Sequence, residues 1–139
     1  MIVLDTDVLS EVLRLEPESR VLAWLDEQPA NSVFTTAITQ GEILYGIRLL
    51  ADGQPRRKLW EAAAAIFPDD FDGRVLSFDS DAAGHYAQIG ASRRSTGRPI
   101  SQFDATIAAI TRSHGASLAT RNAKDFEGCG IDVINPWVE

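Results

Sequence analysis

The chain has 139 residues, 45% of them hydrophobic, which is typical of one folded domain with a sizeable core. The formal net charge of −7 argues against a protein that binds nucleic acid by bulk electrostatics alone. One cysteine and two histidines rule out an intrachain disulfide bond and a zinc site made of these side chains.

The chain also lacks a basic leader segment and an apolar run long enough to cross a membrane. We therefore expect a cytoplasmic protein with no membrane partner.

Short apolar runs alternate with helical patterns along the chain. In chain order we predict a strand at 2–4, helices at 8–13 and 18–27, a strand at 32–35, helices at 36–50 and 56–66, a loop at 67–73, a strand at 74–78, a helix that begins at the 79–81 cluster and ends near 95, a helix at 101–113, a strand at 116–120, a helical turn at 122–126 and an edge strand at 131–134. This alternation indicates an α/β fold with a central, mainly parallel sheet of four to five short strands, flanked by α-helices, in a single domain of residues 1–139.

Polar side chains follow several of these strands or begin the helices after them. Asp5 ends the first strand, Glu42 lies early in the helix after the second strand, and Asp104 lies early in the helix at 101–113. Asn122 comes just after the fourth strand, with Asp125 three residues further on. Because the carboxyl ends of parallel strands share one edge of a sheet, where ligands bind, we expect these side chains to gather there.

Glu42 and Asp104 have apolar sequence neighbours, and a carboxylate on a buried face is costly unless it is paired or binds a metal. Oxygen ligands without cysteine or histidine favour Mg²⁺ or Mn²⁺. Such an ion can bind a phosphodiester and lower the pKa of a water molecule. We therefore predict a metal-dependent nuclease.

Each acid also has a simpler interpretation. Asp5 can cap the first helix, Glu42 can lie on a solvated helix face, and Asp104 can stabilise a helix start through the helix dipole. Asp125 can be an ordinary surface residue. Asp7 is interpreted as a capping or solvated residue and not as a catalytic one.

Five segments carry a resemblance to a known family. They are LDTDVLSE at 4–11, GEILYG at 41–46, DATIAA at 104–109, ATRNAKDF at 119–126 and INPW at 134–137. In this order and spacing they resemble the PIN domain of VapC-type toxins, and in particular the FitB-like branch that includes plasmid stability proteins. The resemblance extends from the first residues to the last.

The resemblance implies a PIN-like fold and a Mg²⁺- or Mn²⁺-dependent endoribonuclease that hydrolyses RNA through a metal-activated water. It implies the toxin of a type II toxin–antitoxin pair, inhibited by a VapB-like antitoxin that inserts a peptide into the active-site groove. It also implies a homodimer, and contact with operator DNA only through the antitoxin.

The resemblance implies metal ligands at Asp5, Glu42 and Asp104. The fourth acid of many relatives corresponds to Asn122, whose amide oxygen can still bind a metal or hold a water, and relatives usually have asparagine at the position of Asp7. Including the hydroxyl near the first acid, the implied catalytic residues are Asp5, Thr6, Glu42, Asp104, Asn122 and Asp125.

Basic and hydroxyl side chains supply candidate contacts to a single-stranded or looped RNA. The predicted substrate-binding residues are Arg121, Thr120, Lys124 and Arg112. Arg93, Arg94 and Arg98 form a further basic group near one helix end.

Three other functions compete with the toxin. A HAD-type phosphatase would fit the strand-Asp-x-Asp start, but Leu9 stands where threonine or valine is expected and the chain is short for that fold. A binding or regulatory module that acts with a DNA-binding partner would treat Asn122 as the mark of a weakened site. A PIN nuclease of RNA processing would be distinguished by the lack of an adjacent antitoxin gene.

Overall fold

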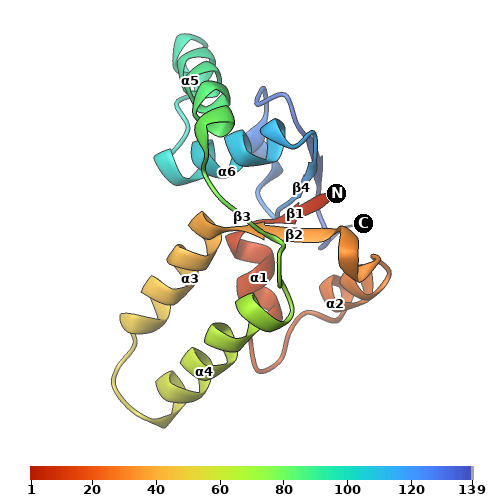
Figure 1. Cartoon of the computed structure of the whole chain (residues 1–139), viewed down its shortest axis with the longest axis vertical. Coiled ribbons are helices and arrows are strands. Elements are labelled where there is room, and N and C mark those ends of the chain that lie inside the picture. Colours follow the sequence, from red (N-terminus) through yellow and green to blue (C-terminus); the bar gives the residue numbers. More distant parts are fainter. Residues whose placement is uncertain (139) are drawn as a thin grey trace.

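Five short strands form the centre of the computed structural model, which describes residues 1–138 (Figure 1). The strands are β1 (Ile2–Leu4), β2 (Val33–Thr36), β3 (Val75–Leu76), β4 (Ser117–Ala119) and β5 (Asp132–Ile134). Their order across the sheet is β3-β2-β1-β4-β5, and the neighbouring strands pair in parallel. The predicted α/β class and its parallel sheet are thus confirmed.

Six α-helices and two 3₁₀ helices connect the strands. They are α1 (Thr6–Val12), α2 (Ser19–Asp26), η1 (Ala30–Ser32), α3 (Ala37–Arg48), α4 (Gln54–Asp69), α5 (Ser80–Ser95), α6 (Gln102–Ser113) and η2 (Ala123–Phe126). In residues 1–138 no helix combines the length and the apolar character that crossing a membrane requires.

The helices cover both faces of the sheet, with α1 to α4 on one side and α5 and α6 on the other (Figure 1). Side chains alternate along a strand, so neighbouring residues enter different layers. Leu4 packs with Leu9, Trp24 and Ile43 in the first core, whereas Val3 packs with Ile107 in the second. This double cover explains why the strands are apolar nearly throughout.

The central strand β1 is the point at which the chain changes direction across the sheet. The chain adds β2 and β3 on one side of β1 and then returns to add β4 and β5 on the other. Leu4 is in register with Ala119, so Asp5 and Thr120 follow at the same edge. In open α/β sheets ligands bind at the carboxyl ends of the strands at such a switch point.

Several element boundaries differ from the sequence prediction by a few residues. The first helix begins at Thr6 and not near Val8, because Asp5 caps it. Helix α4 continues into the predicted loop at 67–73 as far as Asp69, with Pro68 in its last turn, and Phe67 in that turn is buried in the first core. Burial of this aromatic ring offsets the helix hydrogen bond that proline cannot make. Strand β3 is limited to Val75–Leu76.

Candidate active site

Asp5 lies at the carboxyl end of the central strand and is 6% exposed. Its backbone N–H donates to the carbonyl oxygen of Ala119 at 3.1 Å, and its Oδ1 accepts from the N–H of Val8 at 3.1 Å. Burial raises the pKa of Asp5 from 3.8 to about 7, although hydrogen bonds from Thr120 and Val8 act in the opposite direction. The capping interpretation is therefore correct for one oxygen, and the carboxyl group also sits in an environment that disfavours its charge.

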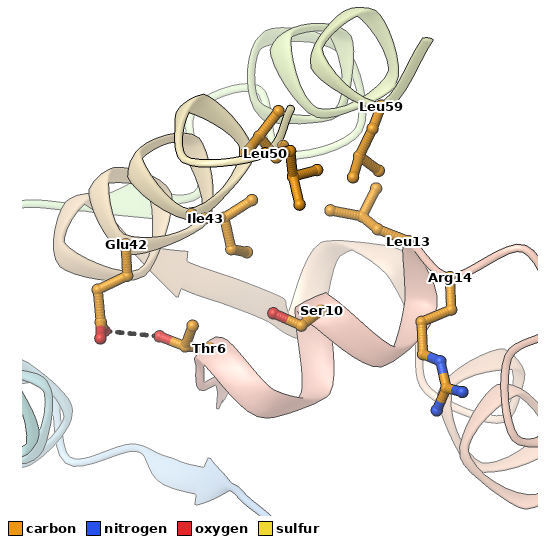
Figure 2. Close-up of a pocket in the computed structure, with 10 residues that line it drawn as sticks. Thr6, Ser10, Leu13, Arg14, Glu42, Ile43, Leu50 and Leu59 are labelled. Atoms are coloured by element: carbon orange, nitrogen blue, oxygen red, sulfur yellow. Dashed lines mark hydrogen bonds between the residues drawn. The ribbon is translucent and has the colours of Figure 1, made fainter. Parts of the chain in front are cut away.

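Glu42 approaches this edge from α3, one turn after the helix begins (Figure 2). Thr6 donates a hydrogen bond from its Oγ1 to Oε1 of Glu42 at 2.7 Å, and the hydroxyl oxygens of Thr6 and Thr39 are 3.2 Å apart. Burial raises the pKa of Glu42, while the hydrogen bond from Thr6 lowers it. The bond fixes the direction of the Glu42 carboxylate, as expected for a catalytic or ligating group.

Asp104 lies in the first turn of α6, where Ser101 caps the helix by accepting from the N–H of Asp104 at 3.2 Å. Burial is the main cause of its raised pKa, and the charges of Asp125 and Asp7 act in the same direction. The charge of Asp104 in turn raises the pKa values of Asp5 and Glu42. The three acids are thus brought close enough together to interact electrostatically.

Asp7 belongs to the same group and is exposed; the sequence favoured a capping or solvated role for it, and the family resemblance added a further negative oxygen at the rim of the site. Asp5, not Asp7, caps α1, and the Asp7 carboxylate accepts a hydrogen bond from the side-chain amide of Asn122. The charge of Asp7 raises the pKa values of Asp5, Glu42 and Asp104. The sequence signal for including Asp7 in the site was its position two residues after Asp5, in the first turn of α1.

Asn122 and Asp125 follow β4 at the same edge, and both side chains are exposed. The backbone N–H of Asn122 donates to Oγ1 of Thr120 at 3.1 Å, and the N–H of Asp125 donates to the carbonyl oxygen of Asn122 at 3.0 Å. Asp125 faces Asp104 closely enough to raise its pKa. The fourth segment of the predicted site is therefore beside the other three.

The predicted substrate-binding residues are divided by the structure. Arg121 and Lys124 are exposed near the site, and the Arg121 guanidinium lies 5.0 Å from the ring centre of Trp137. Thr120 is fully buried, so the prediction that it contacts the substrate is wrong. Its hydroxyl group instead forms hydrogen bonds with the carboxylate of Asp5 and the backbone N–H of Asn122.

Arg112 is not brought to the acids. It lies in the last turn of α6, whereas Asp104 lies in the first turn of the same helix. Its guanidinium donates to Gln88 at 3.1 Å and lines a hollow with Gly115 and Gly130, which precede β4 and β5. Residues that precede parallel strands lie at the edge opposite the acids, so the prediction of Arg112 as a substrate-binding residue is wrong.

A hollow of about 290 Å³ adjoins Glu42 between α1, α3 and α4 (Figure 2). Thr6, Ser10 and Glu42 lie at one end, and aliphatic side chains such as Leu13 and Leu59 line the other. A second hollow of about 590 Å³ adjoins the other side of Glu42 and is lined by Ala37, Ile38, Gly41, Glu42, Tyr45 and Phe103.

The donor atoms at this edge are oxygens of carboxylates, hydroxyls and one amide, which suit Mg²⁺ or Mn²⁺ better than zinc. In residues 1–138 no three Asp, Glu, His or Cys side chains are grouped tightly enough to ligate one ion as they stand. The raised pKa values of Asp5, Glu42 and Asp104 nevertheless mark a place where negative charge is uncompensated. The chemistry of this donor set therefore fits a hard divalent cation.

Comparisons with known proteins agree along nearly the whole chain. The family model of the PIN domain matches residues 2–128. The chain is 39% identical over 137 residues to VapC ribonuclease Y4jK of Sinorhizobium fredii, which covers 99% of this chain and 98% of that protein. It is 39% identical over 137 residues to Toxin FitB of Neisseria gonorrhoeae, which covers 99% of each. A solved structure of FitAB bound to an IR36 DNA fragment superposes with a TM-score of 0.92 at 39% identity, over 99% of this chain and 96% of that chain.

Proposed function

The chain belongs to the PIN domain family, and we propose that it is the toxin of a type II toxin–antitoxin pair, a metal-dependent endoribonuclease that acts in the cytoplasm. Support comes from relatives of nearly equal length that are named a VapC ribonuclease and a toxin. The observation that carries the nuclease is the convergence of Asp5, Glu42 and Asp104 from three distant parts of the chain on one sheet edge, where their charges interact. If these acids were only helix caps or solvated surface residues, nothing would require them to lie close together.

We assign Asp5, Glu42 and Asp104 as the residues that hold a Mg²⁺ or Mn²⁺ ion. When bound, such an ion neutralises the carboxylates, binds a phosphodiester oxygen and makes a water molecule a better nucleophile. Thr6 orients the Glu42 carboxylate through its hydrogen bond, and Thr120 forms a hydrogen bond with the Asp5 carboxylate. These contacts pre-organise the acids, which is how a protein scaffold contributes to metal-assisted hydrolysis.

The fourth position of the site combines two side chains. Asn122 holds the Asp7 carboxylate, and that carboxylate interacts with the other three acids. We propose that Asp7 supplies the negative charge that an acid at position 122 would otherwise supply, with Asn122 orienting it. Asp125 adds charge beside Asp104 and is proposed to position water or the RNA.

We propose single-stranded or looped RNA as the substrate, with Arg121 and Lys124 as contacts to its phosphates. Both cations are exposed beside the fourth segment of the site. The net charge of −7 makes such local cations necessary, because the molecule as a whole repels nucleic acid.

We propose that a VapB-like antitoxin inhibits the enzyme by laying a peptide in the hollow of Figure 2. An apolar peptide segment fits the aliphatic end near Leu13 and Leu59, and a basic side chain fits beside Glu42. The solved FitAB structure that contains a DNA fragment supports a partner of this class. Operator DNA is then bound through the antitoxin, since the toxin itself is acidic.

We further propose a homodimer that covers the second hollow. Tyr45 is 66% exposed and Phe103 is 57% exposed in this hollow, and Leu49 extends the apolar surface along α3. Large apolar side chains that are exposed together mark interaction surfaces. Sedimentation of the wild type should give a dimer, and Phe103→Ser should shift the protein toward the monomer.

Purified, antitoxin-free protein should cleave a mixed RNA pool in the presence of Mg²⁺ or Mn²⁺. Cleavage should be lost with EDTA and in Asp5→Asn, and it should persist in Asp72→Asn, which removes an exposed acid of a surface loop. Failure of folded wild-type protein to cut RNA in either metal would overturn the nuclease. Cleavage that the product of a neighbouring antitoxin gene does not inhibit would favour the RNA-processing alternative.

A further inference from the structure

Arg93 is a buried cation in the last turn of α5, and it is 7% exposed. In residues 1–138 its guanidinium forms no salt bridge with a carboxylate. Its N–H groups donate to backbone carbonyl oxygens instead. A buried charge is costly unless hydrogen bonds satisfy it, so its burial has to be explained by what these bonds hold together.

The bonds of Arg93 join two segments that carry residues of the active site. Its Nη1 donates to the carbonyl oxygens of Asp125 at 2.7 Å and Glu127 at 2.9 Å, both in the segment that follows β4. Its Nε donates to the carbonyl oxygen of Arg98 at 2.7 Å, in the connection that leads to Asp104. The guanidinium is a rigid planar group, so it fixes the spacing of everything that it bonds.

Segment 122–129, which runs from Asn122 to Cys129, depends on this anchor more than on regular structure. It contains only the short 3₁₀ helix η2. Cys129 at its far end is buried, with its Sγ 3.8 Å from Nη1 of Arg93. Without the guanidinium, the carbonyl groups of Asp125 and Glu127 would lose their side-chain donor, and the segment would be held by the burial of Phe126, the exposed Arg98–Glu127 pair and its own turns.

The position of the positive charge also suits the acids. The charge of Arg93 lowers the pKa of Asp104, against the combined effect of burial and of the neighbouring carboxylates. The neighbouring cations behave differently, since Arg98 is paired with Glu127 at the surface and Arg94 is exposed. The sequence interpretation of Arg93 as part of an RNA-binding group is therefore wrong, because its guanidinium is turned into the protein.

We propose that Arg93 is a positioning residue of the active site, which fastens segment 122–129 to α5 and the approach to α6 so that Asn122 and Asp125 face Asp104. This inference rests on the proposed nuclease function. It differs from a purely structural role, in which loss of Arg93 would lower stability and leave the folded enzyme fully active.

The test compares Arg93→Met and Arg93→Lys with the control Lys58→Met, which removes an exposed cation from α4. Amide hydrogen exchange of segment 122–129, thermal unfolding, and kcat and KM for RNA with Mn²⁺ are measured well below the unfolding temperature. In Arg93→Met we expect exchange of this segment to speed up about tenfold and kcat to fall roughly 10- to 100-fold with little change in KM, because a displacement of about 1 Å can cost that much. Arg93→Lys keeps the charge and part of the hydrogen bonding, so it should recover part of both losses, and Lys58→Met should match the wild type.

Unchanged kcat and unchanged exchange in folded Arg93→Met would overturn the proposal, even if the melting temperature falls. If Arg93→Met does not fold, the same two readouts in Arg93→Lys decide the matter, because lysine lacks the rigid planar fork with which arginine bonds both segments. Absence of RNA cleavage by the wild type would refute the nuclease function instead, and hydrogen exchange would still report whether Arg93 holds the segment.

Discussion

Asp5→Asn is expected to abolish cleavage and also to stabilise the metal-free protein above neutral pH. Burial raises the pKa of Asp5 to about 7, so the folded state keeps a proton that the unfolded chain releases near the ordinary value of 3.8. Between these pH values the unfolded state binds fewer protons than the folded state. The free energy of unfolding therefore falls as the pH rises through this window and levels off above it.

The size of the effect follows from the shift. The part of this window from pH 5 to pH 7 spans about 2 pH units, and each pH unit changes the free energy of unfolding by about 1.4 kcal/mol, which gives roughly 3 kcal/mol. Asparagine has the same shape, can still accept from the N–H of Val8 and does not ionise. We therefore expect the stability advantage of Asp5→Asn over the wild type to grow by roughly 3 kcal/mol from pH 5 to pH 8.

Urea unfolding at the two pH values, with EDTA present, measures this difference. Asp72→Asn is the matched control, because it removes an exposed carboxylate and should follow the wild type at both pH values. A stability difference between Asp5→Asn and the wild type that stays constant from pH 5 to pH 8 would refute the reasoning. It would mean that the Asp5 carboxylate ionises without penalty in the folded protein.

Three further predictions address other parts of the molecule. Thr6→Val keeps the side-chain shape but removes the donor to Glu42, so steady-state kinetics should give a kcat about tenfold lower with KM little changed. Calorimetry should show that Asp7→Asn alone weakens Mn²⁺ binding about tenfold. Asp7→Asn combined with Asn122→Asp should restore the affinity, because the exchange moves the carboxylate to the other side of one hydrogen bond. Equal weakening in both variants would contradict the proposal that Asp7 and Asn122 share the fourth position. Leu118→Ala leaves a cavity at a fully buried position of β4 and should cost about 2 to 5 kcal/mol in urea unfolding, whereas a cost below about 1 kcal/mol would contradict the second core.

The sequence was most informative where function and local pattern coincide. An apolar run that ends on Asp5 predicts both the central strand and the acid at its carboxyl end, and Glu42 and Asp104 follow from helices that start at the same edge. Local rules such as capping and alternation act over a few residues, so a single sequence displays them directly.

What the sequence could not provide are contacts between distant residues. Asp7 and Asn122 are 115 positions apart, and no local pattern pairs them. Arg93 lies in the last turn of a helix, where a basic side chain is usually solvated. Its acceptors are backbone carbonyl oxygens, which every residue has, so the sequence does not reveal them. Arg112 is a different case, because its eight-residue separation from Asp104 along one helix, about 12 Å at 1.5 Å per residue, already argued against a shared site.

The order of the active-site residues along the chain has a consequence for the cell that makes the protein. Asp5 and Glu42 are synthesised first, whereas Asp104, Asn122 and Asp125 belong to the last third of the chain. Strand β4 is added beside β1 only after that last third emerges, so a growing chain carries Asp5, Asp7 and Glu42 but still lacks the Asp104 and Asp125 that complete the group of acids. With the proposed nuclease function, we therefore expect RNA cleavage to begin only after the last third of the chain has been made and folded.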